Sequence, residues 1–250
     1  MFPHSNLDWM LCVFDKVSST NDLAKRLAGT GAPEGTVVVS RKQSMGKGRF
    51  GRRWISPSGG LWASLLLRPK TSQNIALLPI LAGIATAKAV EEVALVKVKL
   101  KWPNDLLIGN RKLGGVLVES CYSGTQLRGA IVGLGINVRN SSLDLPKRLK
   151  TRAVSLRDIG REVAELDLLQ HILDHVGSRY ELFRTGKIEF LQREWRQLSS
   201  EVGKRLLVKT SGNICEGLAT GIDSDGALLV KISTGSTVRV LSSDQLAHFQ

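Results

Sequence analysis

Residues 41–54, RKQSMGKGRFGRRW, carry the highest density of side chains that could do chemistry. The segment contains six basic residues, three glycines and no acidic residue within 14 positions. Glycines allow backbone N–H groups to turn toward a bound anion, and Lys47, Arg49, Arg52 and Arg53 supply positive charge. Basic runs of this length are usually solvated loops, but glycines interleaved with cations favour an anion-binding site.

Two familiar nucleotide-binding motifs can be compared with this segment. Gly46, Gly48 and Gly51 match the GxGxxG pattern of dinucleotide-binding folds. That pattern requires a helix directly after the glycines and an acidic residue about 20 positions later. Here residues 52–54 lead into a strand, and Thr71 stands near the acidic position. A P-loop is excluded because the sequence has no GxxxxGK[ST] motif, so neither fold is predicted.

Residues 101–119, KWPNDLLIGNRKLGGVLVE, form a second candidate segment. The proline ends the preceding strand, which leaves Asn104 and Asp105 at the end of that strand, where polar groups can face a cleft. Gly114 and Gly115 open the next strand and permit close approach of a ligand or of another backbone. Each residue alone has a structural explanation as a core, turn or surface residue, but the combination favours a site.

The hydrophobic pattern predicts the elements that must position these segments. Ser19-Thr20 has the residue types of a helix N-cap, before a short amphipathic helix. Runs that are β-branched or alternate in hydropathy predict strands, and spacings of three and four predict helices. The strands are expected at 36–40, 61–68, 95–101, 116–119 and 127–133, and the helices at 21–28, 75–94, 166–183 and 188–198. The buried stripe of helix 166–183 is expected to contain Leu166, Leu169, Leu173, Val176, Tyr180 and Phe183, and that of helix 188–198 to contain Ile188, Leu191, Trp195 and Leu198.

The pattern changes after residue 199. Short strand-like runs at 206–209, 214–220, 227–232 and 237–241 are separated by turn-forming residues, including Ser211-Gly212-Asn213. About 50 residues of meandering β structure predict a small barrel that packs on the larger domain.

Net charge points to an anionic partner. The chain carries 35 Lys and Arg against 22 Asp and Glu, for a net charge of +13. Residues 199–250 hold five basic and five acidic residues, so the excess lies in 1–198. A basic surface of this kind favours nucleic acid, phosphates or an acidic protein, and charge alone does not choose among them.

Composition excludes several classes of protein. With 250 residues and 42% hydrophobic residues, the chain is typical of a globular protein. The longest uncharged stretch, 71–87, spans 17 residues and contains Pro and Gly, which predicts a buried helix and no membrane span. Residues 1–15 lack the basic residues of a signal peptide. Cys12, Cys121 and Cys215 are odd in number and far apart, so we expect no disulfide framework and a cytoplasmic location.

Histidine and cysteine chemistry is not expected. His171 and His175 stand four apart on a predicted helix, but they lack a third candidate ligand and are expected to be exposed. Cys121 follows an apolar strand and is interpreted as a small buried hydrophobic residue. We therefore predict no protein-bound metal site.

Together these segments resemble the biotin protein ligases. The resemblance covers residues 12–140 and extends to the small β domain after residue 200. It implies an α+β fold: a mixed β-sheet with flanking helices in 1–198, the class II synthetase-like biotin/lipoate ligase core, and a small C-terminal SH3-like β-barrel in 199–250. The matching motifs are STN at 19–21, Gln43, GKGRFGRRW at 46–54, GLW at 60–62, LRP at 67–69, KWPND at 101–105, RKLGG at 111–115 and GLGIN at 133–137.

The resemblance implies an ATP-dependent ligase. Such an enzyme joins biotin to ATP as biotinyl-5′-AMP and then transfers biotin to one lysine of a biotin carboxyl carrier protein. The biotin carboxylate attacks the α-phosphate itself, so the site needs cations, backbone donors and Mg²⁺ to offset repulsion between two anions. By similarity the catalytic residues are Lys112, Arg49 and Asp105. A lipoate-type ligase on the same scaffold and a biotin-sensing DNA-binding regulator are alternatives.

The resemblance also assigns two sets of binding residues. Ser19, Thr20 and Gln43 are expected to hydrogen-bond the ureido ring of biotin, and Trp54 is expected to stack on adenine. The Lys47 position is often Arg in the family. The biotin set is Ser19, Thr20, Asn21, Gln43, Lys47, Gly48, Arg49, Lys112, Gly114, Gly115, Gly133 and Gly135. The last four, all glycines, are expected to leave space for the bicyclic ring. The ATP or adenylate set is Gly46, Lys47, Arg49, Arg52, Trp54, Asn104, Lys112 and Asn137.

The expected partners follow from the same resemblance. The substrates are biotin and ATP, the acceptor is the carrier protein, and the chain is a monomer or a homodimer with no membrane partner. About 15 residues precede the first core motif, too few for a three-helix DNA-binding module, so the monofunctional form without specific DNA binding is expected. The basic strand face at Lys97, Lys99 and Lys101 could guide an acidic carrier, although a solvated face is the simpler explanation. The basic stretch 147–161 has no assigned role.

Overall fold

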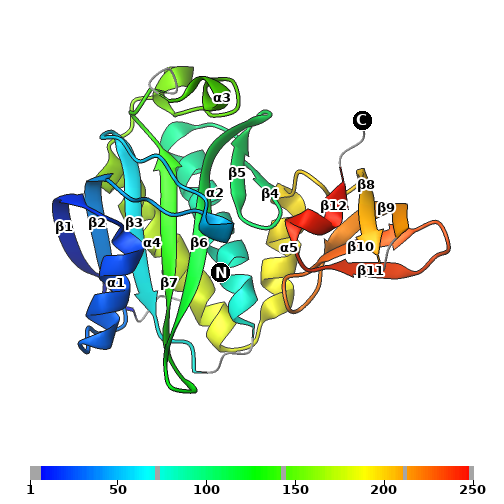
Figure 1. The fold of residues 1–250 in the computed structure, drawn as a ribbon, viewed down its shortest axis with the longest axis horizontal. Coiled ribbons are helices and arrows are strands. Elements are labelled where there is room, and N and C mark those ends of the chain that lie inside the picture. Colours follow the sequence, from blue (N-terminus) through cyan, green and yellow to red (C-terminus); the bar gives the residue numbers. More distant parts are fainter. Residues whose placement is uncertain (1–6, 71–73, 142–144, 211–212, 248–250) are drawn as a thin grey trace.

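The computed structural model describes residues 7–70, 74–141, 145–210 and 213–247, which form two β-sheets with flanking helices (Figure 1). The larger sheet has seven strands in the order β1-β2-β3-β7-β6-β5-β4, and the smaller has five in the order β11-β10-β9-β8-β12. In the larger sheet β1 is parallel to β2 and the other pairs are antiparallel. The mixed sheet with helices and the separate small β domain confirm the predicted α+β class.

The elements have the following bounds. The larger sheet contains β1 (Met10–Val17), β2 (Thr36–Gln43), β3 (Gly60–Leu67), β4 (Lys99–Lys101), β5 (Asp105–Ile108), β6 (Arg111–Ser123) and β7 (Gln126–Asn137). The smaller sheet contains β8 (Arg205–Thr210), β9 (Asn213–Ile222), β10 (Leu228–Ile232), β11 (Thr237–Val240) and β12 (Leu246–Ala247). The α-helices are α1 (Thr20–Gly29), α2 (Leu78–Ala94), α3 (Lys147–Lys150), α4 (Glu165–Arg184) and α5 (Ile188–Leu198). Short 3-10 helices include η1 (Arg49–Gly51) and η2 (Ile75–Leu77).

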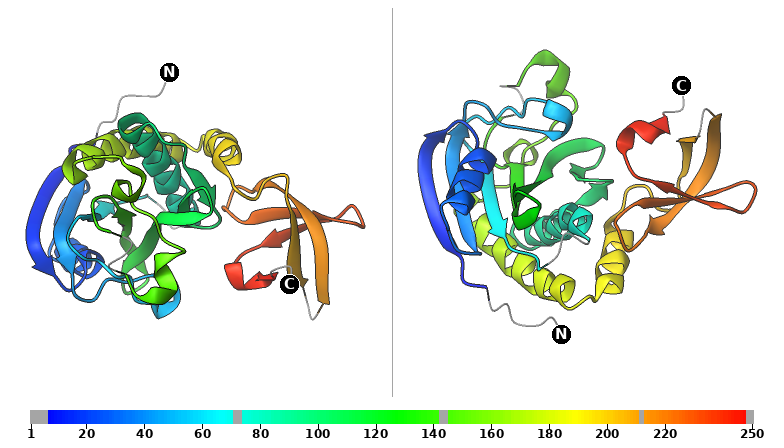
Figure 2. Two further views of the ribbon diagram at one scale, coloured as in Figure 1. Left: turned by 90° about the horizontal axis from the view of Figure 1, so that it is seen from above. Right: turned by 60° about the horizontal axis from the view of Figure 1, so that its bottom comes forward.

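The larger sheet is covered on both faces. Helices α2 and α4 lie behind it and α1 lies in front, as Figures 1 and 2 show. Strand β3 is buried at every position, because one face packs into the main hydrophobic cluster and the other lies under α1 and the β2–β3 loop. Leu65 faces the cluster under α2 and α4, and Leu66 faces Ala24 of α1. Helix α2 is apolar on nearly all sides, and none of the described helices has the length and hydropathy to cross a membrane.

The register of the central strands lays small residues side by side on the α1 face. Ser64 of β3 pairs with Gly133 of β7. Two residues along, Trp62 pairs with Gly135, which in turn pairs with Gly115 of β6. Because paired residues of neighbouring strands share a face, these positions form a shallow floor between α1 and the β2–β3 loop.

Strand 95–101 was predicted too long. The structure has only β4 (Lys99–Lys101), because α2 ends at Leu95 in a left-handed conformation with φ 54° and the chain then turns back to the sheet. Leu95 is 77% exposed. The alternation of Val and Lys therefore extends over residues 95–98, which connect α2 to the sheet, as well as over the strand itself.

Two further expectations differ from the structure at element level. Leu166 was assigned to the buried stripe of its helix but is 52% exposed, and Leu168 and Ile172 fill the core instead. Spacings of three and four admit neighbouring registers of one helix, which explains the error. Strands β1 and β5 were not predicted. β1 is an edge strand with exposed apolar residues such as Val13, so it has no clear alternation of buried and exposed positions.

The small β domain is joined to the end of β4. Trp102 Nε1 donates to the carbonyl of Gly226 at 2.9 Å, and Trp102 N donates to Glu201 Oε1 at 3.1 Å. Ser200 N donates to the carbonyl of Leu100 at 2.8 Å. Trp102 is 4% exposed, so the tryptophan of the KWPND motif acts here as a core residue that fastens the two parts together.

Glu201 at this junction gives a test of stability against pH. Burial is the largest cause that raises the pKa of Glu201, and hydrogen bonds from Trp102 N and two serines partly oppose it. A raised folded-state pKa means that its stabilising contribution is present at low pH and is lost as pH rises through that pKa. Gln retains the carbonyl that Trp102 N needs. We therefore expect Glu201→Gln to gain unfolding free energy relative to the wild type as pH rises above about 4.

Urea denaturation at a series of pH values measures this effect. The matched control is Glu216→Gln, an exposed residue of β9 that pairs with Arg205. A difference between Glu201→Gln and the wild type that is constant with pH, or that falls as pH rises, would contradict the assignment.

Candidate functional site

The β2–β3 loop crosses the front of the larger sheet toward β6 (Figure 1). Two backbone hydrogen bonds fold it on itself: Trp54 N donates to Gly46 O at 2.8 Å, and Gly48 N donates to Arg52 O at 2.7 Å. A Cβ on Gly46 would lie 2.5 Å from Trp54 O, so only glycine fits there. The loop thereby carries its cations across the floor of small residues.

The two segments identified in the sequence meet at the start of β5. Arg49 Nη1 lies 3.5 Å from Asn104 Oδ1, and Lys112 Nζ lies 2.6 Å from Asp105 Oδ1. Asn104 Nδ2 donates to Val116 O at 2.8 Å, which turns its oxygen toward Arg49. Since Asn104 and Asp105 are consecutive, a guanidinium from the loop and an ammonium from β6 converge on one place.

Burial affects the arginine of this pair. Loss of solvent lowers the pKa of Arg49, and the charge of Asp105 partly opposes this effect. A cleft of about 450 Å³ lies beside Arg49 and Asn104, and its far side is formed by Gly226 and Arg239 of the small β domain. The volume is in the range of small-molecule sites, and its wall includes the cation that would meet an anionic ligand.

The backbone of Lys112 is fixed by a segment far along the chain. Lys112 N donates to Arg152 O at 2.7 Å, and Val154 N donates to Lys112 O at 3.0 Å. The basic stretch 147–161, which had no predicted role, therefore contains the segment that positions Lys112, one of the three predicted catalytic residues. The sequence did not predict this contact, because the local residue pattern of neither segment indicates which distant segment it pairs with.

Trp54 lies between Lys112 on one side and Trp62 of the floor on the other. Its ring centroid is 5.1 Å from Lys112 Nζ and 6.5 Å from the Trp62 ring, which it meets edge-on. A Cβ on Gly135 would lie 2.9 Å from Trp54 Nε1. This indole nitrogen is buried and has no hydrogen-bond partner within the described part of the chain. A buried N–H of this kind is suited to a ligand oxygen.

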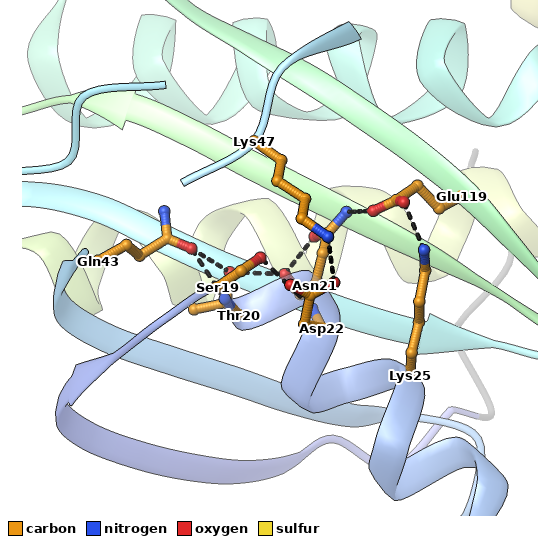
Figure 3. Close-up of polar contacts among 9 residues, drawn as sticks. Ser19, Thr20, Asn21, Asp22, Lys25, Gln43, Lys47 and Glu119 are labelled. Carbon is orange, nitrogen blue, oxygen red and sulfur yellow. Dashed lines mark hydrogen bonds and ion pairs between the residues drawn. The ribbon is translucent and has the colours of Figure 1, made fainter. Parts of the chain in front are cut away.

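The other end of the floor is polar (Figure 3). Ser19 caps α1, and its Oγ accepts from Asp22 N at 3.4 Å. Thr20 N donates to Gln43 Oε1 at 2.8 Å, and Gln43 Nε2 donates to Ser56 Oγ at 2.8 Å. The helix N-terminus and the end of β2 thus place hydroxyl and amide groups together, as predicted for a polar head group. Lys47 reaches across to Asp22 Oδ1 at 2.5 Å.

Several predicted glycines accommodate protein groups in this structure. The space above Gly133 is filled by the amide of Asn21, and Trp54 fills the space above Gly135. A Cβ on Gly114 would lie 2.5 Å from Gly135 O, so Gly114 permits close packing of β6 on β7. Around Gly115 and Gly48 the nearest atoms lie at 3.4 and 3.3 Å. Their expected role as space for a bicyclic ring stays a prediction.

Two predicted nucleotide contacts have other surroundings here. Asn137 is 5% exposed, donates from Nδ2 to Val154 O at 3.2 Å and accepts from Asn140 Nδ2 at 3.0 Å. Arg52 is exposed on the loop and directly follows η1 in the chain. These positions do not test the binding roles, which stay predictions for both residues.

Three polar residues of the site were absent from the sequence prediction. Ser64, Ser56 and Glu119 join the polar end through hydrogen bonds to predicted site residues. A carboxylate at position 119, within the otherwise apolar run VLVE, was the available signal. The two serines lack such a signal because serine is common at many positions.

The remaining titratable candidates do not form a metal site. His171 is exposed as expected, but His175 is half-buried, since its Nε2 pairs with Glu92 at 2.9 Å and its Nδ1 lies 2.9 Å from Arg179 Nη1. Within residues 7–70, 74–141, 145–210 and 213–247, no three potential ligands gather closely enough to hold an ion. Cys121 is half-buried, and burial raises the pKa of its thiol, which disfavours a nucleophilic role.

Comparison with known proteins gives consistent matches over nearly the whole chain. Residues 13–137 match the biotin/lipoate A/B protein ligase family, and residues 202–244 match the biotin protein ligase C-terminal domain. The bifunctional ligase/repressor BirA of Bacillus subtilis (strain 168) is 37% identical, over 90% of this chain and 70% of that protein. A biotin–[acetyl-CoA-carboxylase] ligase of Paracoccus denitrificans is 28% identical, over 89% of this chain and 95% of that protein. A solved structure of the Aquifex aeolicus biotin protein ligase in complex with biotin and ATP has a TM-score of 0.81 at 29% identity, covering 95% of this chain and 97% of that chain.

Proposed function

Because this chain belongs to the biotin/lipoate A/B protein ligase family, we propose that it is a biotin protein ligase that acts on a biotin carboxyl carrier protein. The enzyme activates biotin with ATP as biotinyl-5′-AMP and then transfers biotin to a lysine of the carrier. The match of residues 202–244 to the C-terminal domain of biotin protein ligases supports biotin as the acid in preference to lipoate. We propose a catalytic domain in 1–198 and the SH3-like domain in 199–250.

One observation carries this proposal: Arg49 and Lys112 converge at Asn104 and Asp105. In the first step a carboxylate oxygen of biotin attacks the α-phosphate, and the bond to pyrophosphate breaks. Both reactants are anions, so positive side chains held at the meeting point lower the barrier by stabilising charge that builds up in the transition state. In the second step the carrier lysine attacks the acyl carbon, an amide forms, and AMP leaves. Neither step needs a nucleophile from the protein.

The other residues around the floor would bind the remaining parts of biotin and ATP. Thr20 and Gln43 would contact the ureido ring, with Ser19 beside them. Trp54 would stack on adenine, and the glycine-rich β2–β3 loop would keep out the water that hydrolyses a mixed anhydride. Asn104 Oδ1 and the Asp105 carboxylate are hard oxygen donors, which fits a Mg²⁺ ion bound mainly by ATP phosphates. That ion would neutralise phosphate charge when bound.

The proposal is tested by exchange of labelled pyrophosphate into ATP. We expect exchange that depends on biotin, with lipoate giving no more than the rate without acid. Addition of a biotin carboxyl carrier protein should then give a biotinylated lysine and AMP. Exchange with lipoate alone would establish the lipoate ligase in its place. Absence of exchange with either acid, together with binding to biotin-operon DNA, would support the regulator.

A further inference from the structure

Glu119 of β6 is a carboxylate beside the polar end of the site, where it contacts Asn21 and Lys25 (Figure 3). Its Oε2 accepts from Asn21 Nδ2 at 2.7 Å, and its Oε1 pairs with Lys25 Nζ. The side chains of Lys25 and Glu119 are 33% and 24% exposed. Asn21 is 4% exposed, so its amide has few partners besides the groups that surround it in the protein.

The negative charge on Glu119 fixes the orientation of the Asn21 amide. An ionised carboxylate accepts hydrogen bonds and cannot donate them, so the NH₂ group of Asn21 must face it. The Asn21 oxygen then faces Ser64 Oγ, which lies 2.6 Å from it. Gly133 makes this arrangement possible, because a Cβ there would collide with the Asn21 oxygen.

The orientation of the Asn21 amide determines which oxygen atoms accept the hydroxyl hydrogens of Ser64 and Thr20. Ser64 has one hydroxyl hydrogen, and the Asn21 oxygen can only accept, so Ser64 donates to Asn21. Ser64 Oγ also lies 2.7 Å from Thr20 Oγ1, and Thr20 Oγ1 lies 3.1 Å from Gln43 Oε1. The Thr20 hydrogen is therefore used inside the protein, on either of those two oxygens. Toward a ligand, Thr20 Oγ1 offers lone pairs alone.

We propose that Glu119 is a positioning residue that sets the hydrogen-bond polarity of this site, acting through Asn21 and Ser64 on Thr20. The consequence is selection of a head group that donates N–H to Thr20 Oγ1. The inference rests on the proposed function and deepens it, since the cyclic urea of biotin carries two N–H groups around one carbonyl. The Ser19 hydroxyl and the second hydrogen of Gln43 Nε2 are the matching donors for that carbonyl.

Glu119→Gln tests this polarity. Lys25 holds the carbonyl oxygen of the substituted side chain, so the new NH₂ group faces Asn21, and the Asn21 amide must turn over. Asn21 then donates to Ser64, Ser64 donates to Thr20 Oγ1, and an N–H from the ligand competes with that hydrogen. We expect KM for biotin to rise about tenfold or more while kcat changes less than about twofold. The preference for biotin over biotin methylated on one ureido nitrogen should shrink by a similar factor.

Matched variants separate polarity from stability. Glu91→Gln makes the same substitution in the Lys88–Glu91 pair of α2, whose side chains are 35% and 27% exposed, and should leave KM for biotin unchanged. Lys25→Met removes the ion pair but keeps the carboxylate, so it should keep the preference for biotin even if it lowers Tm. Asn21→Asp combined with Glu119→Gln should restore KM, because a carboxylate at position 21 accepts both from the amide introduced at position 119 and from Ser64.

The outcomes distinguish this inference from the proposed function. Failure of the wild type to exchange pyrophosphate with biotin would refute the function itself. Normal exchange in the wild type, with KM and preference unchanged in Glu119→Gln, would overturn the polarity inference alone. Equal loss of preference in Lys25→Met, or no recovery in the double variant, would overturn it as well and assign Glu119 a structural role.

Discussion

Replacing Lys112 by alanine is expected to reduce biotin-dependent pyrophosphate exchange by about 10²- to 10³-fold, the loss typical for removal of one preorganised group that stabilises transition-state charge. Lys112 is the cation of β6 that lies nearest to Asp105 and to the ring of Trp54. Without it, the cations of the β2–β3 loop, Arg49 among them, would have to offset repulsion between the biotin carboxylate and the α-phosphate without a cation from β6. The fall should appear in kcat as well as in kcat/KM, because the charge is needed in the transition state.

Lys112→Ala is expected to leave the fold intact. The Lys112–Asp105 pair is 34% and 28% exposed, and pairs this accessible to solvent contribute about 1 kcal/mol or less. Lys88→Ala is the control, because Lys88 forms a similarly exposed pair with Glu91 on α2. Exchange should be normal in Lys88→Ala, and Tm should be similar in the two variants. Exchange within a few-fold of the wild type in Lys112→Ala would remove this residue from the mechanism.

Local sequence pattern predicted the elements that are amphipathic or capped. Helix α5 buries Ile188, Leu191, Trp195 and Leu198, the residues that the spacing selected. Helix α1 begins where the Ser19 cap predicted. These predictions succeeded because periodicity reports the side of an element that must leave water. They needed no knowledge of which element lies opposite.

Edges and connections were harder to predict for a physical reason. Strand β1 lies at the edge of the larger sheet and exposes Met10, Leu11 and Val13, so no alternation distinguishes it from a loop. In contrast, residues 95–98 alternate in hydropathy but lie in the return from α2. Whether such a segment is a strand depends on the partner strand that it reaches, and this information is not local.

In the candidate site, too, some features could be predicted from the sequence and others could not. The resemblance to the biotin protein ligases predicted that Arg49 and Lys112 belong to one site, and the structure brings their segments to adjacent residues of β5 and the turn before it. The supporting contacts could not be predicted, since Asn21 and Glu119 are 98 residues apart. The glycines show the same limit. The resemblance implied that Gly133 leaves space for the biotin ring, and the structure shows that the amide of Asn21 occupies that space.

Arg49→Ala is the second variant with a large expected effect. Arg49 is the loop residue that contacts Asn104, and its guanidinium also lies 4.8 Å from the Phe50 ring. Because it contacts Asn104, next to the Lys112–Asp105 pair, we expect it to meet both the biotin carboxylate and the phosphate. We expect kcat/KM for exchange to fall about 10²-fold, with KM for ATP raised, since a charge-assisted contact is lost in the ground state as well.

Arg49→Lys separates charge from geometry. Lysine keeps the positive charge but loses the planar fork that can hold two oxygens at once, so it should recover part of the rate and leave KM raised. Arg205→Ala, which removes an exposed arginine of β8 paired with Glu216, should behave as the wild type. If Arg49→Ala and Arg205→Ala gave equal exchange rates, the loop would serve only to cover the floor. Lys112 of β6 would then be the cation that stabilises the transition state, without help from Arg49.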